Sequence, residues 1–243
     1  EDTKAALVPF DTLLFKHLAY TFNRAARSFS YGLFGGPSNA SAQTDAFSRP
    51  FYKTINRFSA NFALTADLCL GLLAGDIKRK EMLSGRLADI HAHLFIATAI
   101  LKFYEKGQRS EVEQQHAQLA LEKAFVQIQD AFDGLFANFP MRAAACVVKF
   151  ICFPFGRVAQ QPSDQLKTQL GRVIMENNPF REQLKQHVFY NTDPDDVFGR
   201  MENAFQAALK IDPLWTKFKK AESKGQFEGL DFESHIQHAL ETG

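Results

Sequence analysis

The sequence has no excess of either charge. Its 243 residues include 28 Lys and Arg against 27 Asp and Glu, so the net charge at pH 7 is +1. A protein that binds nucleic acid usually shows a basic excess or a basic stripe. The balanced composition therefore excludes a general attraction to nucleic acid, and we expect no nucleic-acid partner.

Cysteine is scarce as well. The three residues, Cys69, Cys146 and Cys152, are isolated and lie in apolar segments. Cys146 and Cys152 are six residues apart, which gives neither a CxxC motif nor a shared helical face. This pattern excludes a disulfide framework and a zinc site. It predicts three buried thiols in a reducing compartment, so we expect a cytoplasmic protein.

Motifs of common catalytic sites are missing. The sequence contains no GxGxxG, no P-loop, no GxSxG and no HExxH. It contains one ExxH, Glu113 with His116, whereas a di-iron helix bundle needs two. Asp89 and His93 share a helical face, but Arg86 competes for the carboxylate. We predict no catalytic, cofactor-binding or metal-ligating residue. A self-contained helical metalloenzyme is a third alternative for the function, and it rests only on Glu113, His116 and the pair of Asp89 and His93.

We expect no transmembrane helix in this sequence. The run from Ala143 to Phe155 includes Lys149 and is broken by Pro154, whereas a spanning helix needs about 20 apolar residues. A helix that is apolar over most of its circumference lies in a core or an interface. We predict that Met141 to Phe153 form such a helix, packed inside this region or against another domain. Arg142 and Lys149 form a basic stripe, predicted to face solvent or lipid headgroups.

What the sequence does contain is phenylalanine, with 25 residues. So many large apolar side chains exceed what one domain needs to bury. The natural use of the surplus is a surface that docks another domain.

Apolar residues recur at helical spacing, and no run alternates as a strand would. We predict an all-α fold, with a bundle of long antiparallel helices over residues 1–160 and a smaller subdomain of short helices over residues 161–243. The short helices are expected near residues 163–176, 180–189, 195–211, 213–223 and 231–241. A seam of alternating three- and four-residue spacings predicts close packing of the third long helix. The seam residues are Leu83, Leu87, Ile90, Leu94, Ala97, Leu101 and Tyr104.

Local signals predict where the helices begin and end. Pro9 is a favoured first-turn residue and predicts the start of the first helix. Gly75 is expected to cap the second helix, and Asp76 to cap the start of the third. Ser110 and Glu113 have the spacing of a capping box at the start of the fourth.

The densest basic cluster is IKRKE, with Lys78, Arg79 and Lys80 at a predicted helix start. Cations there oppose the helix dipole. The cluster is therefore a candidate site for an anionic partner: an acidic side chain, a lipid headgroup or a CoA phosphate. The alternative is a solvated helix end paired with Glu81 and Asp76.

A second basic segment, WTKFKKAESK, places Lys217, Lys219 and Lys220 beside Trp215 and Phe218. Such an amphipathic segment is typical of helix packing, and contact with a membrane surface is the alternative.

Several strings, in this order and at these separations, resemble the C-terminal helical region of bacterial FadE-type long-chain acyl-CoA dehydrogenases. The strings are FDTLLFKHLAY (10–20), FYKTINRFSANFAL (51–64), GDIKRKEMLSGRLADI (75–90), NFPMRAAACVVKFICFPFGR (138–157) and PSDQL (162–166). The likeness continues more thinly in DDVFGRMENAFQAALKIDPLW.

The resemblance implies a parent flavoprotein of fatty-acid β-oxidation. Such an enzyme uses FAD to oxidise an acyl-CoA to the trans-2-enoyl-CoA and passes electrons to an electron-transfer flavoprotein. In the family, the flavin-binding domains and the glutamate base lie upstream of the matched region, and this sequence starts at Glu1. No catalytic or FAD-binding residue is therefore carried over, and we expect this chain alone to be inactive and to bind no FAD.

The resemblance leaves three roles open for this region: packing on the catalytic domain, assembly of a homodimer, and peripheral contact with the inner face of the bacterial inner membrane. For the last role, the candidate residues are Lys78, Arg79, Lys80, Arg142 and Lys149. The alternative function is a free-standing helical interaction or membrane-surface protein.

Overall fold

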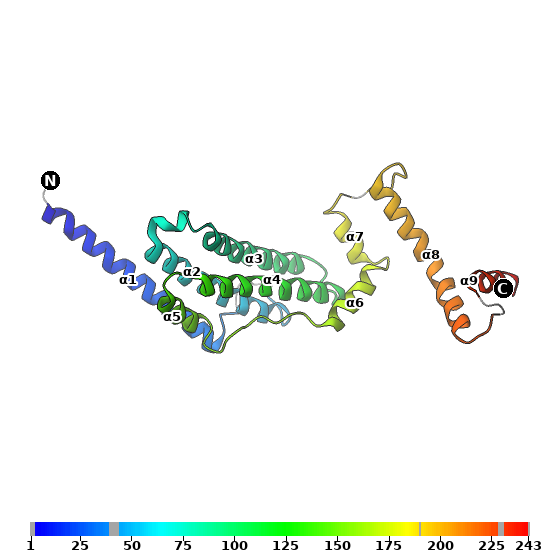
Figure 1. Cartoon of the computed structure of the whole chain (residues 1–243), viewed down its shortest axis with the longest axis horizontal. Coiled ribbons are helices and arrows are strands. Elements are labelled where there is room, and N and C mark those ends of the chain that lie inside the picture. The colour runs from blue at the N-terminus through cyan, green and yellow to red at the C-terminus, as the bar shows by residue number, and fades with distance from the viewer. Residues whose placement is uncertain (1–2, 39–43, 190, 228–230, 243) are drawn as a thin grey trace. The chain divides into compact units, whose positions relative to one another are not determined.

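The computed structural model describes residues 3–38, 44–189, 191–227 and 231–242. These residues form nine α-helices and one short 3-10 helix, η1, with no strand among them (Figure 1). The all-α prediction is confirmed. The elements are α1 Thr3–Phe34, α2 Ser48–Leu73, η1 Ala74–Lys78, α3 Glu81–Lys106, α4 Glu111–Asn138, α5 Arg142–Cys152, α6 Asp164–Ile174, α7 Pro179–Lys185, α8 Val197–Ser223 and α9 Phe232–Thr242.

The chain forms two compact units, residues 1–171 and 172–243. The boundary between a long-helix bundle over residues 1–160 and a subdomain of short helices over residues 161–243 stays a prediction.

The core of the first unit lies among α2, α3, α4 and α5. The α3 and α4 helices run side by side as an antiparallel hairpin (Figure 1). Six of the seven predicted seam residues of α3 are buried, and Leu87 is half-buried. Phenylalanine rings fill the centre: Phe132 lies 6.2 Å from Phe58 and 5.4 Å from Phe153, between ring centroids. Burial of these large apolar side chains supplies most of the stability of this unit.

The α3–α4 connection contains the predicted capping box. Gly107 caps the end of α3, and Ser110 and Glu113 form the capping box at the start of α4. The Glu113 carboxylate accepts hydrogen bonds from the Ser110 and Gln108 backbone N–H groups, at 2.8 Å and 3.2 Å. A Cβ atom on Gly107 would lie 2.5 Å from this carboxylate, so a larger residue would displace the Glu113 side chain from its capping position.

The predicted signals at the α2–α3 connection are wrong. Ala74, not Gly75, takes the positive φ of 45° that ends α2, and the chain continues into η1. Asp76 does not cap α3. Its backbone C=O accepts the N–H groups of Arg79 and Lys80, and α3 starts after Lys80 without a side-chain cap. The extra 3-10 turn moves the start of α3 beyond the reach of the Asp76 side chain.

The first helix begins at Thr3, so the predicted start at Pro9 is wrong and the proline lies within the helix. The C-terminal half of α1 is anchored to the bundle. Buried Ser28 donates a hydrogen bond to Asn61, whose side-chain amide donates to the Cys152 carbonyl at 3.2 Å. Arg24 forms an ion pair with Asp67 of α2.

The α5 helix matches the predicted range within one residue at each end. It buries Ala145, Val148 and Cys152 against the core. Cys146, however, is exposed, so the prediction of three buried thiols is wrong for this residue. Cys146 and Cys152 lie on different sides of the helix, and only one side faces the bundle.

In the second unit, α8 is one continuous helix that contains Pro213. The two helices predicted near 195–211 and 213–223 are therefore wrong as separate elements. A proline removes one backbone hydrogen bond and strains one turn, and here the helix continues through it. Residues 211–217 are all exposed, so no buried side chain is displaced at this turn.

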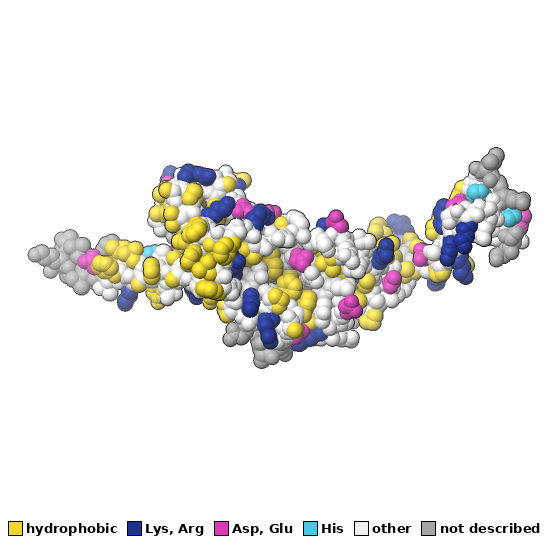
Figure 2. All heavy atoms as spheres, turned by 90° about the horizontal axis from the view of Figure 1, so that it is seen from below, with side chains coloured by type: hydrophobic (Ala, Val, Ile, Leu, Met, Phe, Trp, Pro, Cys, Tyr) yellow, Lys and Arg dark blue, Asp and Glu magenta, His cyan; other side chains and the backbone are white. Residues whose placement is uncertain are grey.

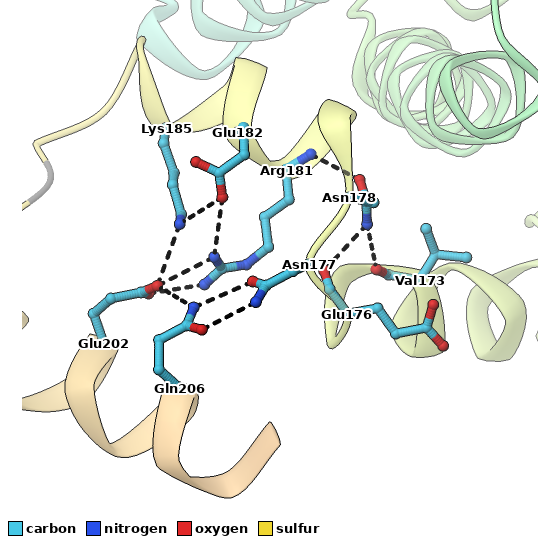
Figure 3. Close-up of polar contacts among 9 residues, drawn as sticks. All are labelled: Val173, Glu176, Asn177, Asn178, Arg181, Glu182, Lys185, Glu202 and Gln206. Carbon is cyan, nitrogen blue, oxygen red and sulfur yellow. Dashed lines mark hydrogen bonds and ion pairs between the residues drawn. The ribbon is translucent and has the colours of Figure 1, made fainter. Parts of the chain in front are cut away.

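A polar network joins α7 to α8 (Figure 3). The Glu202 carboxylate accepts hydrogen bonds from Arg181 at 2.8 Å, Lys185 at 3.2 Å and Gln206 at 2.8 Å. Gln206 also exchanges hydrogen bonds with Asn177. The hydrogen bond from Arg181 is the main reason that the pKa of Glu202 falls to about 2.

Candidate functional site

Three of the predicted cations gather where η1 meets α3. Lys78 ends η1, and Arg79 and Lys80 form the link to α3. Arg86 follows on the next turns of α3. We call Lys78, Arg79, Lys80 and Arg86 the basic corner. A hollow of about 480 Å³ opens beside it. Its lining residues are Arg79, Lys80, Glu81, Met82, Leu83, Arg86, Asn138 and Pro140.

The basic corner has unused capacity to bind an anion. Among the described residues, Lys78, Arg79 and Lys80 form no ion pair within 4.0 Å. The pairing with Glu81 and Asp76, the alternative from the sequence, is not formed. Arg86 donates a hydrogen bond to the Met82 carbonyl at 3.2 Å. The uncapped N–H groups of α3 add a partial positive charge at the same place.

Exposed apolar side chains flank the basic corner. Leu70 and Leu72 lie on the last turn of α2, and Met82 lies on the first turn of α3. Leu70 and Met82 are more than half exposed. Cations beside exposed apolar side chains are typical of surfaces that meet anionic amphiphiles or bilayers.

The other two predicted cations have partners inside the first unit. Arg142 donates hydrogen bonds to the carbonyls of Phe136 and Ala137, which lack helical partners at the end of α4. Lys149 lies 3.5 Å from the carboxylate of Asp133, which also pairs with Arg157. The structure therefore brings Lys78, Arg79 and Lys80 together and gives Arg142 and Lys149 contacts that hold α5 on α4.

A second surface lies on α1. Every residue from Asp11 to Tyr20 is exposed, although this segment is rich in large apolar side chains. We call residues 11–23 the α1 arm. Its exposed large apolar residues are Leu13, Leu14, Phe15, Leu18, Tyr20 and Phe22. Figure 2 shows hydrophobic atoms along this helix, at the left of the view.

The metal-ligand candidates do not converge. Glu113 is engaged in the capping box, and Nδ1 of His116 lies 2.8 Å from the Val112 carbonyl. Within the described ranges, no group of three or more His, Cys, Asp or Glu side chains is placed to hold a metal ion.

The buried thiols are poor nucleophiles. Burial raises the pKa of Cys69 to about 11, and burial likewise raises that of Cys152 to about 11. A thiol reacts as its thiolate, which is therefore rare at neutral pH.

Sequence reasoning missed Arg86 as a member of the basic corner, and it missed the exposed apolar neighbours Leu70, Leu72 and Met82. Arg86 could have been found, because it lies seven residues after Arg79, which is two turns along the helix that the sequence predicts to start at Asp76. Nothing in the sequence distinguishes an exposed Leu70 from a buried one.

Two stretches, Ser48–Lys78 and Glu81–Lys106, are long and apolar enough to cross a membrane by length and composition. Core helices of bundles pass the same test, and both stretches contribute side chains to the core of the first unit. These two stretches therefore do not show membrane contact.

No solved structure matches the chain. The sequence does match the protein family described as acyl-CoA dehydrogenase, C-terminal, bacterial type, and the match covers residues 1–243. The predicted resemblance is thus confirmed over the whole chain, and the chain belongs to the family of bacterial-type acyl-CoA dehydrogenase C-terminal domains.

Proposed function

We propose that this chain is the docking domain of a FAD-dependent acyl-CoA dehydrogenase of fatty-acid β-oxidation. The family is the C-terminal part of an oxidoreductase. In the parent enzyme, an acyl-CoA is oxidised to the trans-2-enoyl-CoA, and an electron-transfer flavoprotein accepts the electrons. The role of this chain is to pack on the catalytic domain and hold the assembly together in the cytoplasm.

The α1 arm carries this proposal. Phe15 is 68% exposed and Phe22 is 76% exposed. At 100° per residue, the large apolar side chains of the arm spread over most of its circumference. A helix that is apolar over most of its circumference is normally buried. The catalytic domain precedes this region in the family, so it is the nearest surface able to cover α1.

The residues of the basic corner do not fit a flavin. A dinucleotide is usually held by a glycine-rich loop at a helix start, and the sequence has no such loop. The hollow at the basic corner offers cations, one carboxylate and one amide side chain, with no aromatic side chain to stack on a flavin ring. We therefore assign no step of the redox chemistry to these residues.

The test is a double substitution, Phe15→Asp with Phe22→Asp, in the full-length parent enzyme. We expect the two charges to prevent burial of the α1 arm. Cleavage by trypsin between the catalytic domain and this domain should then accelerate by at least about tenfold, because burial of two unpaired charges costs several kcal/mol. Flavin content and activity of the double variant show whether its catalytic domain is intact.

The matched control is Phe155→Asp, which changes an equally exposed phenylalanine outside α1. It should leave the cleavage rate unchanged. A double variant that resists trypsin as well as wild type does would overturn the docking role of α1.

A second candidate role is contact with an anionic bilayer through the basic corner, which would place the enzyme at the inner face of the inner membrane. The supporting observation is the unpaired set of Lys78, Arg79 and Lys80 beside exposed Leu70 and Met82. Arg142 and Lys149 are not part of this surface, because they contact α4.

Flotation with vesicles tests this second role. Binding to vesicles that contain phosphatidylglycerol should fall as salt rises, because surface attraction is screened. Lys78→Glu with Lys80→Glu should abolish it. The control Lys167→Glu reverses an exposed cation on α6 and should leave binding intact. Equal binding to neutral vesicles would exclude an electrostatic contact.

A further inference from the structure

The second unit contains a groove between α8 and α9 that none of the functions above uses. Its volume is about 750 Å³, within the range of roughly 300 to 1,000 Å³ that is typical of small-molecule sites. The groove is lined by Ile211, Leu214, Trp215, Lys217, Phe218, Ala221, Gln226, Phe227, Ile236, His238, Ala239 and Leu240.

The groove is apolar along its length. Its half-buried floor includes Phe218, Phe227 and Ile236, and its exposed rim includes Trp215 and Leu240. The aromatic rings form a continuous layer: the Phe218 centroid lies 5.5 Å from that of Trp215 and 5.0 Å from that of Phe227. Stacked rings of this kind make a rigid wall that favours contact with alkyl groups.

Positive charge lies on the α8 side of this apolar groove. The sequence between residues 208 and 227 contains five lysines and two acidic residues. Figure 2 shows Lys and Arg atoms gathered over the α8 end of this unit, at the right of the view. Lys219 is engaged by Glu222 at 2.7 Å. Lys217 lines the groove itself, and no described acidic side chain lies within 4.0 Å of it.

We propose that this groove binds a long alkyl chain that ends in an anionic group, such as a fatty acyl anion. The chain would lie along Trp215, Phe218 and Phe227, and Lys217 would pair with the anionic end. Burial of each further methylene strengthens binding, so affinity rises with chain length. An apolar groove with a cation at its rim complements both parts of such a molecule.

Trp215 is the only tryptophan of the chain and lies on the groove. Its fluorescence therefore reports occupancy of this groove alone, even if probe molecules also bind the α1 arm. The experiment titrates the 243-residue chain with laurate, hexanoate and dodecyl maltoside, each below its micelle concentration. We expect laurate to cause a saturable blue shift of the emission at one molecule per chain, and hexanoate to cause none.

Two charge-reversal variants on α8 test whether Lys217 is the cation that pairs with the anionic end of the ligand. Lys217→Glu should weaken laurate binding about fivefold to tenfold, as expected for loss of one exposed ion pair and gain of one repulsion. It should leave binding of uncharged dodecyl maltoside unchanged. Lys210→Glu, also on α8 but outside the groove lining, should change laurate affinity by less than about twofold.

Filling the groove gives an independent check. Ala239→Phe should abolish the shift with both long-chain probes, with helix content confirmed by circular dichroism. If this variant fails to fold, the charge reversals decide, because Lys217 and Lys210 are exposed in α8. The proposal is overturned if laurate gives no saturable shift, if hexanoate binds equally well, or if both charge reversals weaken laurate to the same extent. None of these results depends on docking to the catalytic domain.

Discussion

The two units are stabilised in different ways. The first buries layers of aliphatic and aromatic side chains, and Phe58, Phe132 and Leu121 are fully buried. In the second, the only buried residue of the 27-residue helix α8 is Gly199. That unit relies on the Glu202 network and on exposed ring contacts. Regions with few buried apolar contacts open more readily than a packed core, so we expect the second unit to unfold first.

The largest effect is expected from Val148→Asp in the first unit. Val148 is 8% exposed and packs on the core from α5. The new carboxylate would be buried without a partner, which should lower the free energy of unfolding by about 3 to 5 kcal/mol. Urea unfolding followed by circular dichroism measures the change.

The neighbouring substitution Val147→Asp is the control, because Val147 is 59% exposed on the same helix. It should change the stability by less than about 0.5 kcal/mol. Equal effects of the two substitutions would contradict the orientation of α5.

An intermediate effect, confined to the second unit, is expected from Glu202. Its pKa falls from 4.5 to about 2 in the folded state. A lowered pKa means that the stabilisation is complete above about pH 4.5 and is lost as the pH falls towards 2. Glu202→Gln should therefore cost about 1 to 3 kcal/mol at pH 7 and nearly nothing at pH 2.

Trp215 lies in the second unit and reports its unfolding by fluorescence. The control is Glu176→Gln, which neutralises an exposed carboxylate in the same unit and should give a pH profile like that of wild type. If Glu202→Gln keeps the acid sensitivity of wild type, the network does not stabilise the folded unit.

The smallest effect is expected from Lys149→Ala. The lysine side chain is 51% exposed, and its partner Asp133 keeps a second cation, Arg157, at 2.6 Å. The change in the free energy of unfolding should stay below about 0.5 kcal/mol. Thermal unfolding of the first unit measures it, with Arg157→Ala as the companion variant, which should cost more because it removes contacts with both Asp130 and Asp133. The reverse order would show that Lys149 is the main partner of Asp133.

The parts of the fold that could be predicted are those set by local periodicity. The seam of α3 and the Ser110–Glu113 capping box both depend on residues within one or two turns, and both are confirmed. The prediction failed where a signal can be satisfied in more than one way. Ala74 accepts the conformation expected of Gly75, and α8 continues through Pro213.

In the candidate site, too, local features could be predicted from the sequence and contacts between helices could not. Lys78, Arg79 and Lys80 are consecutive, so their proximity required no knowledge of the fold. The partners of Arg142 and Lys149 lie on α4, and they depend on how α5 packs against it. The exposure of Phe15 and Phe22 depends on what lies beside α1, which no pattern within the helix encodes.

The α1 arm has a practical consequence for measurements of molecular mass. When this chain is purified alone, each copy exposes the apolar side chains of the α1 arm to every other copy. Exposed apolar surface of this kind promotes self-association. The molecular mass obtained by light scattering at a single concentration would then be that of aggregates of this chain. The stoichiometry of the parent enzyme should be read from the full-length protein, and a dilution series of this chain would instead measure how strongly the uncovered helix attracts any apolar surface.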